Sequence, residues 1–398
     1  MKILHVVPSY LPATRYGGPI YSIHGMCSAL AKRGHTVRVI TTNVDGSGAS
    51  PVPIGEPVLL DGVEIRYFPS PVLRRLYWSP DMGSELEAHV RRVDCVHVHS
   101  IFLWPTWAAA RASRRCRVPY VMAPHGMLVK DLVHRKSRWA KRAWIRWIDK
   151  RNIEEAAALH VTSQIEANEA EAFGFELPPI AMVPNGFSAS GCKGGGMPSD
   201  DLLPVLGTPD IVLFLGRINW KKGLDRLIPA LARAPRATLV LAGNDEENYR
   251  PVLEQLALQC GVADRIRFVG LVRGANKAAL LSKAKLLVLP SYSENFGNVV
   301  LEAMAAGCPV VVTPEVGAAS IVASAHAGLV TPGGPKELGD AIAGLLQEET
   351  RREEMGRRGA AAVARHYTWD QVAAKMERTY LDITERPDAV GTVCPRQD

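Results

Sequence analysis

Short apolar runs alternate along the chain with longer segments in which apolar positions recur every three or four residues. The opening shows the pattern. Residues 2–8 and 36–42 are strand-like, and residues 18–33 between them have the period of a helix that ends at Gly34. A strand, a helix and a second strand in this order predict a right-handed unit with parallel strands. We therefore expect an α/β fold built on doubly wound parallel sheets.

The alternation continues through the first half of the chain. A small hairpin or two short edge strands are predicted at 58–68, around the turn at Asp61 and Gly62. Ser163 is expected to open a helix that ends at Gly174. Further buried strands are predicted at residues 94–99, 119–123, 156–162 and 180–183.

The second half repeats the alternation after a glycine-rich stretch at 188–208, which is predicted to be a linker. Strands are expected at 210–215, 238–242, 265–269 and 285–290, and helices at 224–234 and 335–347. At 398 residues the chain is too long for one ordinary core and suits two domains of roughly 200 residues. We expect domains at 1–190 and 205–366, a helix at 367–384 and a disordered tail at 385–398.

Two glutamates mark the loop and the helix that follow a buried strand in the second half. Glu294 lies in the loop and Glu302 on the helix, with seven residues between them. Gly297, Asn298 and Val299 would present backbone amides at the helix start, where the helix dipole favours an anion. A carboxylate beside such a phosphate site suits the hydroxyl groups of a sugar or ribose. The plainer interpretation is a strand–helix–strand crossover with a solvated acidic loop.

Cationic and imidazole side chains follow other predicted strands. Arg217 and Lys222 flank the start of a helix after the strand at 210–215, which suits a diphosphate, although a solvated loop would also account for them. His125 follows the strand at 119–123, at the edge where open α/β sheets bind ligands.

Two further features carry less weight. His97 and His99 alternate on one strand and so face the same side. They would suit a metal pair, but no third ligand is expected nearby. We favour the interpretation as polar residues at a strand end near the cleft, and no zinc is predicted. Gly17 and Gly18 precede the first helix, either as a simple turn or to let the backbone approach a ligand closely.

The string Ser-Glu-Asn-Phe-Gly-Asn-Val-Val-Leu-Glu-Ala-Met-Ala-Ala-Gly-Cys-Pro-Val-Val closely resembles the Glu-x7-Glu signature of retaining nucleotide-sugar glycosyltransferases of the family-four type. Arg217 and Lys222 resemble the Arg-x4-Lys of that family, and His125 with Gly126 resembles its His-Gly. The resemblance implies the GT-B fold, with two Rossmann-like doubly wound domains facing a central cleft and a C-terminal helix crossing back to the first domain. The first domain would bind the acceptor and the second the nucleotide sugar.

The resemblance also implies roles for individual residues. Arg217 and Lys222 would neutralise the leaving diphosphate, so no metal and no other cofactor are expected. Glu302 would hold the ribose, Glu294 the sugar hydroxyls, and His125 would lie beside the transferred sugar. The implied catalytic residues are His125, Glu294, Arg217 and Lys222. The implied donor-binding residues are Gly17, Gly18, Arg217, Lys222, Arg273, Glu294, Phe296, Gly297, Asn298, Val299 and Glu302.

The reaction implied by the resemblance is retaining transfer of a hexose-type sugar. The donor would be a UDP- or GDP-linked sugar, and the acceptor a saccharide or lipid-linked saccharide in bacterial surface polysaccharide or lipopolysaccharide synthesis. Two alternatives remain: a nucleotide-sugar epimerase of the same architecture, and a non-catalytic partner subunit. In a partner subunit we would expect the motif residues to have been replaced, whereas this sequence retains Arg217, Lys222, Glu294 and Glu302.

The net charge of +7 favours anionic partners, and residues 130–151 concentrate it. In that segment Trp139, Trp144 and Trp147 are interleaved with lysines and arginines. A basic amphipathic helix of this kind can lie on an anionic membrane, but the tryptophans would equally suit packing inside the domain. Nucleic acid is not expected as a partner. Seven scattered cysteines and the lack of a membrane-spanning apolar run predict a cytoplasmic location, with peripheral contact on the inner face of the cell membrane left open.

Overall fold

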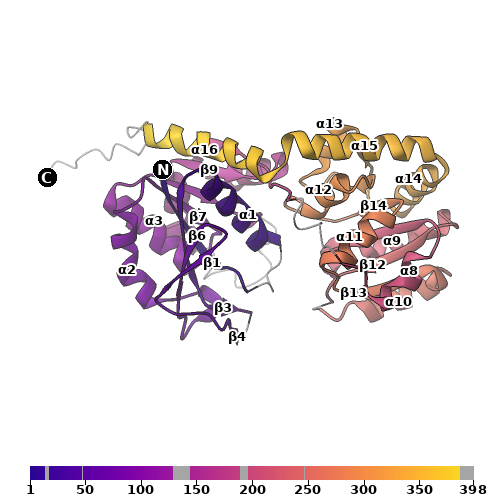
Figure 1. Cartoon of the computed structure of the whole chain (residues 1–398), viewed down its shortest axis with the longest axis horizontal. Coiled ribbons are helices and arrows are strands. Elements are labelled where there is room, and N and C mark those ends of the chain that lie inside the picture. Colours follow the sequence, from indigo (N-terminus) through magenta and orange to yellow (C-terminus); the bar gives the residue numbers. More distant parts are fainter. Residues whose placement is uncertain (14–17, 47, 129–143, 189–195, 246, 386–398) are drawn as a thin grey trace. The chain divides into compact units, whose positions relative to one another are not determined.

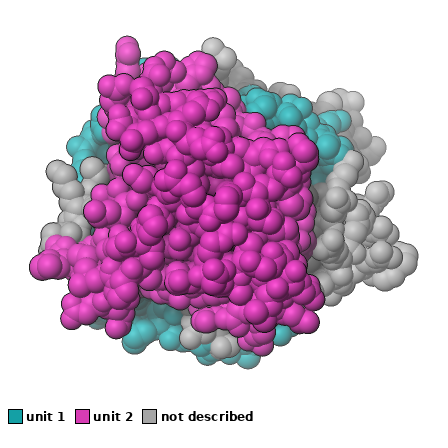
Figure 2. Space-filling view, turned by 90° about the vertical axis from the view of Figure 1, so that its right-hand side faces the viewer, with its two compact units in different colours: residues 1–186, 369–398 teal, residues 187–368 magenta. Residues whose placement is uncertain are grey.

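The computed structural model describes residues 1–13, 18–46, 48–128, 144–188, 196–245 and 247–385. The chain forms two compact units: the first comprises Met1–Gly186 and Trp369–Asp398, and the second Phe187–Thr368. Each unit contains a sheet covered by helices (Figure 1), and Figure 2 shows one face of the second unit as a surface. The second unit is continuous in sequence, whereas the first is completed by the C-terminal part of the chain.

The first unit is built on an eight-stranded sheet in the order β10-β9-β8-β7-β1-β2-β6-β5. Neighbouring strands are parallel except β5 and β6, which form the predicted hairpin. The strands are β1 Lys2–Ser9, β2 Thr36–Thr42, β5 Pro57–Leu60, β6 Val63–Phe68, β7 Cys95–His99, β8 Tyr120–Ala123, β9 Ala158–Val161 and β10 Ile180–Met182. A separate antiparallel pair, β3 Val44–Asp45 with β4 Gly48–Ala49, lies outside this sheet.

Alternate residues of the central strands supply two separate cores, because successive side chains of a strand point to opposite faces. Leu4 and Val6 pack on the face covered by α2 (Pro80–Val90), α3 (Trp104–Cys116) and α7 (Gln164–Phe173). Ile3 and Val7 pack on the face covered by α1 (Gly18–Lys32) and α16 (Trp369–Glu385). Burial on both faces explains why these strands read as almost continuous apolar runs.

The second unit is built on a six-stranded parallel sheet in the order β13-β12-β11-β14-β15-β16. Its strands are β11 Ile211–Leu215, β12 Thr238–Ala242, β13 Ile266–Gly270, β14 Leu286–Leu289, β15 Val310–Val312 and β16 Gly328–Val330. Its longer helices are α9 Leu224–Ala230, α10 Arg250–Gln259, α11 Gly274–Lys283, α12 Asn298–Ala305, α13 Ala319–Ala325, α14 Pro335–Gln347 and α15 Glu349–His366. The strand order reverses between β11 and β14, and open α/β sheets bind ligands at the carboxyl ends of such strands.

The α/β fold predicted from the alternation is confirmed, and β2, β12 and α14 have the predicted bounds. The linker predicted at 188–208 is too long. Its described part contains a 3-10 helix at Asp200–Leu202 and the short helix α8 at Leu203–Leu206, and Leu202 is buried in the core of the second unit. The burial of the Leu202 side chain stabilises helical structure there, although the nearby glycines favour a loop. The predicted tail, apart from Glu385 at the end of α16, lies outside the described residues.

Helix α16 is held against the first unit by apolar burial and by surface ion pairs. Val372, Met376 and Tyr380 are completely buried. At the surface, Arg33 pairs with Glu377 at 2.6 Å and with Asp370 at 3.0 Å. Exposed pairs of this kind stabilise a fold by about 1 kcal/mol or less, so the buried side chains carry most of the attachment.

The Trp369 ring, at the start of α16, lies against Gly25 of α1 and against Gly186. A Cβ atom at either glycine would overlap the ring. The packing of α16 therefore requires the smallest side chain at both positions.

Gly25→Ala is expected to lower the thermal stability of the protein, because overpacking a well-filled core costs about 1–3 kcal/mol. The matched control is Gly344→Ala in α14, where a Cβ would meet nothing within 4 Å. There the substitution should stabilise by roughly 0.5–1 kcal/mol, the usual gain of alanine over glycine in a helix. Calorimetric melting temperatures of the two variants test this, and equal shifts in both would contradict the packing role of Trp369.

Candidate active site

The loops after β11 and β14 meet at the reversal of the second sheet. Arg217 and Lys222 follow β11, and Glu294 follows β14. Gly223 has a φ of 66°, and a Cβ atom there would collide with the Pro290 carbonyl oxygen. The Tyr292 amide donates a hydrogen bond to the Lys221 carbonyl at 2.8 Å. Close backbone contact therefore fixes the two loops against each other.

This contact brings Lys222 and Glu294 together as an ion pair. Only 15% of the lysine side chain and 20% of the glutamate side chain are exposed. The sequence predicted both residues but not their pairing. An ammonium group has three donors, so Lys222 can hold Glu294 and still donate to a phosphate oxygen.

Arg217 differs from Lys222 in having no carboxylate partner among the described residues. Its side chain is exposed at the carboxyl end of β11. A guanidinium in this state keeps all of its donors available, in the fork geometry that suits a phosphate. Arg273, at the start of α11, is also exposed.

Glu302 lies on α12 and pairs with Lys277 of α11 at 2.6 Å. This pairing has no signal in the sequence, and Lys277 was not among the predicted site residues. The second carboxylate oxygen of Glu302, Oε2, is buried and accepts no hydrogen bond from any described residue. A buried, unpartnered oxygen is costly, so a hydroxyl donor from a ligand would stabilise this position.

The loop before α12 is fixed by the loop after β15. The Gly317 amide donates to the Glu294 carbonyl at 2.9 Å, and the Ala318 amide donates to the Phe296 carbonyl at 2.8 Å. Of the predicted donor-binding residues, Phe296 has its side chain in the core, 3% exposed, and Val299 packs partly against that core. Any ligand contact of Phe296 is therefore through the backbone. Gly297 lies directly before the first residue of α12, Asn298.

In the first unit, His125 follows β8 in a left-handed backbone conformation, with φ 53°. The loop is held by Glu166 of α7, whose carboxylate accepts hydrogen bonds from the amides of Gly126 (2.6 Å) and Thr162 (2.8 Å) and from the Thr162 hydroxyl (2.9 Å). Glu166 is 2% exposed and was not predicted. Its signal was the Ser163-x-x-Glu166 capping motif, in which the Glu166 amide donates to the Ser163 hydroxyl. Gly18 begins α1, and Gly17 lies outside the described residues.

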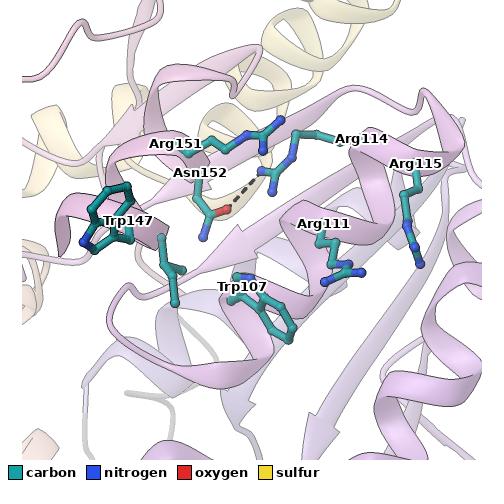
Figure 3. A pocket seen from close by; sticks show the side chains of 8 residues that line it. Trp107, Arg111, Arg114, Arg115, Trp147, Arg151 and Asn152 are labelled. Atoms are coloured by element: carbon teal, nitrogen blue, oxygen red, sulfur yellow. Dashed lines mark hydrogen bonds between the residues drawn. The ribbon is translucent and has the colours of Figure 1, made fainter. Parts of the chain in front are cut away.

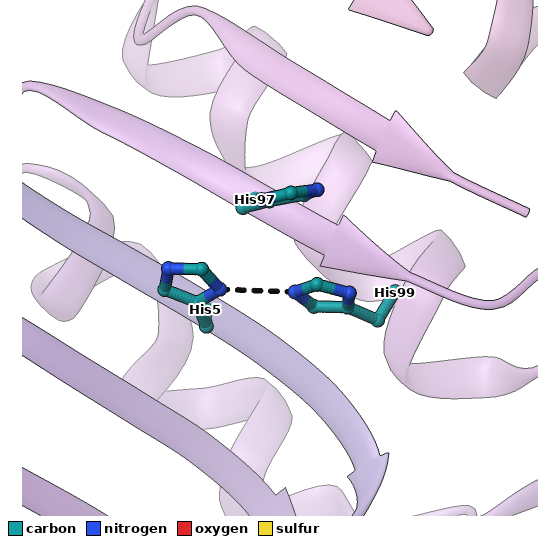
Figure 4. Close-up of side chains that lie close together, drawn as sticks. All are labelled: His5, His97 and His99. Carbon is teal, nitrogen blue, oxygen red and sulfur yellow. Dashed lines mark hydrogen bonds between the residues drawn. The ribbon is translucent and has the colours of Figure 1, made fainter. Parts of the chain in front are cut away.

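His5 of β1 joins His97 and His99 of β7 in a buried cluster (Figure 4). The prediction that no third ligand lies near the His97–His99 pair is therefore wrong, because the fold brings His5 beside them. His5 is far away in sequence, but β1 and β7 are parallel neighbours that pair His5 with His97. One ring nitrogen of each histidine lies within 4.8 Å of the others.

Five of the six ring nitrogens of this cluster already make hydrogen bonds. His5 Nδ1 lies 2.9 Å from His99 Nε2, and His97 Nδ1 lies 2.7 Å from the Tyr380 hydroxyl. Burial lowers the pKa of His5 to about 3 and the pKa of His97 and His99 well below the usual range. Neutral rings that hydrogen-bond one another satisfy their polar groups, apart from His5 Nε2, which has no partner among the described residues. Metal binding would disrupt these bonds without a carboxylate in the trio to offset the charge, so the absence of a metal remains our prediction.

A pocket of about 360 Å³ lies on the surface of the first unit, between α3 and the segment that ends in α6 (Lys150–Glu154) (Figure 3). Three of its arginines are paired: Arg114 and Arg151 with Glu155, and Arg115 with Glu87. The guanidinium of Arg111 instead lies 5.4 Å from the centre of the Trp107 ring. The lining residues are Trp107, Arg111, Arg114, Arg115, Trp147, Ile148, Arg151 and Asn152.

The basic segment predicted at 130–151 is described only from residue 144 onward. There a π-helical turn at Ile145–Asp149 continues into α6, with Trp147 74% exposed and Trp144 partly buried. The two described tryptophans thus differ in environment. No helix of the described residues has both the length and the apolar composition to span a bilayer.

Two Rossmann-like units, with the candidate cations and carboxylates at the strand reversal of the second, define the GT-B class of glycosyltransferases. Family models agree: residues 203–362 match "Glycosyl transferases group 1", and residues 17–186 match "Glycosyl transferase 4-like domain". The chain belongs to this glycosyltransferase family.

Relatives along the whole chain support the assignment. The D-inositol 3-phosphate glycosyltransferase of Xylanimonas cellulosilytica is 30% identical over 98% of this chain and 97% of its own. The phosphatidyl-myo-inositol mannosyltransferase of Mycobacterium leprae is 30% identical over 92% of each chain. The crystal structure of Anabaena HepE in complex with UDP and glucose has a TM-score of 0.72 and 21% identity, covering 96% of this chain and 100% of that one.

The buried histidines make the stability of the first unit depend on pH. Burial, followed by the charge of His160, lowers the pKa of both His5 and His125 to about 3, below the usual 6.5. Between these values the unfolded chain binds more protons than the folded chain. The stabilisation is complete above about pH 6.5 and is lost as the pH falls toward about 3.

We therefore expect acidification from about pH 7.5 to about pH 5 to lower the melting transition of the first unit more than that of the second. The second unit is an internal control, because its described histidines, His326 and His366, are exposed. Differential scanning calorimetry with limited proteolysis can assign the two transitions. A larger shift in the second unit would contradict the neutral state of the histidine cluster.

Proposed function

We propose that the protein transfers a hexose-type sugar, with retention of configuration, from a nucleoside diphosphate sugar to a saccharide or lipid-linked saccharide acceptor. The observation that carries the proposal is the position of Lys222 against Glu294, with Arg217 exposed on the same loop as Lys222. A leaving diphosphate needs positive charge, and the hydroxyls of the transferred sugar need acceptors. This constellation supplies both at the ligand-binding edge of the sheet.

In this proposal, Arg217 binds the diphosphate as a fork and Lys222 acts as a point charge between the phosphates and Glu294. No metal ion is needed for that role, because two cations already flank the diphosphate. Glu294 accepts hydrogen bonds from the sugar, and the unpartnered Oε2 of Glu302 accepts one from the ribose. His125 lies beside the sugar.

The relatives support a nucleotide-sugar donor and leave its base open between UDP and GDP. HepE was crystallised with UDP and glucose, and the relative from Mycobacterium leprae is named as a mannosyltransferase of phosphatidyl-myo-inositol. The second name includes a lipid, which fits an acceptor used in bacterial surface polysaccharide or lipopolysaccharide synthesis. An epimerase would instead convert the donor sugar without any acceptor, and a partner subunit would do neither.

Arg217→Ala and Lys222→Ala should each weaken nucleoside diphosphate binding by about ten- to a hundredfold, since a hydrogen bond to a charged group contributes about 1.5–3 kcal/mol. Lys222→Ala should have the larger effect, because it also leaves Glu294 without its partner. Adding Glu294→Gln to Lys222→Ala should restore part of the affinity. Titration calorimetry with UDP and GDP in excess EDTA measures these affinities without any metal bridge.

The matched control for the lost charge is Arg358→Ala, an exposed arginine on α15 that pairs with Glu354. It should bind nucleotide like the parent protein. If Arg217→Ala and Lys222→Ala also bound like the parent protein, the assignment of the diphosphate site would be wrong.

Glu294→Gln should reduce turnover far more than nucleoside diphosphate affinity, because its partner is the sugar. Glu302→Gln should weaken binding of the free nucleotide by about tenfold, the effect of one hydrogen bond to a charged acceptor. Steady-state kinetics and calorimetry on both variants separate the two effects. Glu315→Gln, an exposed residue of the adjoining loop, is the control. The opposite pattern would show that the roles of Glu294 and Glu302 are exchanged.

We further propose that the first unit makes peripheral contact with anionic membrane through the basic segment at 130–151. Its cations Arg138, Lys141 and Arg142 lie outside the described residues. The proposal rests on the exposed Trp147 and on the neighbouring arginine-lined pocket. A lipid-linked acceptor would be reached from such a surface.

The protein should sediment with anionic vesicles at low salt and be released at high salt, since each base near the surface contributes about 1 kcal/mol and is screened beyond ~8 Å at physiological salt. Trp147→Ala should weaken this binding. Leu258→Ala on α10 is the control, because Leu258 is 71% exposed, similar to the 74% of Trp147. Equal sedimentation with neutral and anionic vesicles would contradict an electrostatic contact.

A further inference from the structure

Five histidines of the first unit form a connected cluster that the proposed function uses only at one end. They are His5 on β1, His97 and His99 on β7, His160 on β9, and His125 after β8. All but His125 are at most 6% exposed. Within the cluster, hydrogen bonds link the rings in two separate branches. The question is which nitrogen of each ring carries the proton.

In the first branch, one backbone carbonyl determines every proton position. His160 Nε2 lies 2.9 Å from the Val183 carbonyl oxygen, which can only accept, so Nε2 carries the proton. Burial keeps this ring neutral, so His160 Nδ1 accepts from His97 Nε2 at 3.3 Å. His97 Nδ1 must then accept as well, and its donor is the Tyr380 hydroxyl at 2.7 Å.

In the second branch, the rings of His5, His99 and His125 follow one another. His5 Nδ1 lies 2.9 Å from His99 Nε2, and His99 Nδ1 lies 2.9 Å from His125 Nε2. The rings are nearly parallel, with interplanar angles of 13° and 14°. In each pair one nitrogen must donate and the other accept, so the two bonds share one direction.

The far end of this branch selects the direction. His5 Nε2 is buried and has no partner among the described residues. Were it protonated, the fold would contain an orphaned N–H donor, which is rarer in proteins than an unused acceptor. His5 is therefore protonated on Nδ1 and donates to His99, and His99 donates in turn to His125 Nε2. His125 is left with its proton on Nδ1, the nitrogen that has no hydrogen-bond partner among the described residues.

We propose that His5 and His99 are positioning residues that hold His125 as the neutral Nδ1–H tautomer, so that His125 donates a hydrogen bond to an oxygen of the bound sugar. This role rests on the proposed function, which puts the sugar beside His125. With Nε2 occupied by the His99 donor, His125 has no lone pair free to act as a base. Its acceptance of that bond polarises the ring and strengthens Nδ1–H as a donor.

The direct test is the protonation state of each ring nitrogen in protein labelled with ¹⁵N-histidine, recorded near neutral pH without ligand. The His125 signals are identified by their loss in His125→Gln. We expect a protonated Nδ1 and an unprotonated Nε2, the reverse of the tautomer that predominates for a free histidine side chain in water. An Nε2–H tautomer in the parent protein would overturn the proposal, and this measurement requires no core variant to fold.

Two variants test the role of His99. His99→Phe removes both hydrogen bonds at similar volume and should shift His125 toward the Nε2–H tautomer. Tyr380→Phe is the matched control, since it removes a buried hydrogen bond of the other branch and should leave the His125 tautomer unchanged. A tautomer that is unaffected by His99→Phe, or is changed equally by Tyr380→Phe, would refute the positioning role.

Kinetics connects the tautomer with the reaction. His99→Phe should lower kcat by about tenfold, the worth of one hydrogen bond, with unchanged UDP and GDP affinity. His99→Asn places an amide donor where Nδ1 was and should recover much of the loss, which a purely structural role of His99 would not predict. The two proposals fail separately: absence of nucleotide binding contradicts the glycosyl-transfer assignment, whereas an Nε2–H tautomer in a protein that binds nucleotide contradicts only this inference.

Discussion

The candidate active site of the second unit depends on the pairing of β11 with β14. These strands are far apart in sequence, and their parallel register, Val212 with Leu286 and Leu213 with Leu287, is fixed by side chains buried on both faces of the sheet. A slip of one residue would turn every buried side chain to the other face, so the cost of a wrong register is large. Because the register is fixed, the loops beyond the strands have one relative position, and Lys222 meets Glu294 there.

Strand pairing also determines the histidine cluster of the first unit. There the pairing of β1 with β7 brings the rings of His5, His97 and His99 together inside the domain. Burying imidazole groups is costly unless each nitrogen finds a partner, and a charged ring would be costlier still. The cluster remains neutral and its rings bond to one another, with Tyr380 and the Val183 carbonyl at the ends of one branch. Among the described residues, the buried Nε2 of His5 has no partner, and this exception determines which nitrogens of the second branch carry the protons.

Much of the architecture was predictable, because the spacing of apolar residues and the length of apolar runs reflect which side chains are buried. The bounds of β2, β12 and α14 were read from the sequence without error, since each is a strongly patterned segment between clear turn residues. The candidate site was predictable as far as single residues in local motifs, such as Glu294 and Arg217. Their roles remain predictions.

What the sequence did not reveal are partners brought together only by the sheet. His5 lies 94 residues from His99 in the sequence, Lys277 reaches Glu302 from another helix, and Glu166 reaches the His125 loop from α7. None of these contacts leaves a local pattern. The linker at 188–208 was predicted too long for the opposite reason, because a local pattern was present but misleading. Leu202 follows glycine and aspartate residues that are typical of a loop, yet it is buried in the core.

The division of the first unit into two stretches of sequence has a consequence for its synthesis. Ribosomes produce the sheet of the first unit early and α16 only after the whole second unit, at roughly 5–20 residues per second. For about ten seconds or more, the sheet face that Tyr380, Met376 and Val372 later cover is finished but bare. The second unit, continuous in sequence, can complete its core in that interval. The nascent chain thus carries an uncovered apolar surface beside a folded neighbour, which is the state in which a ribosome-associated chaperone would find it.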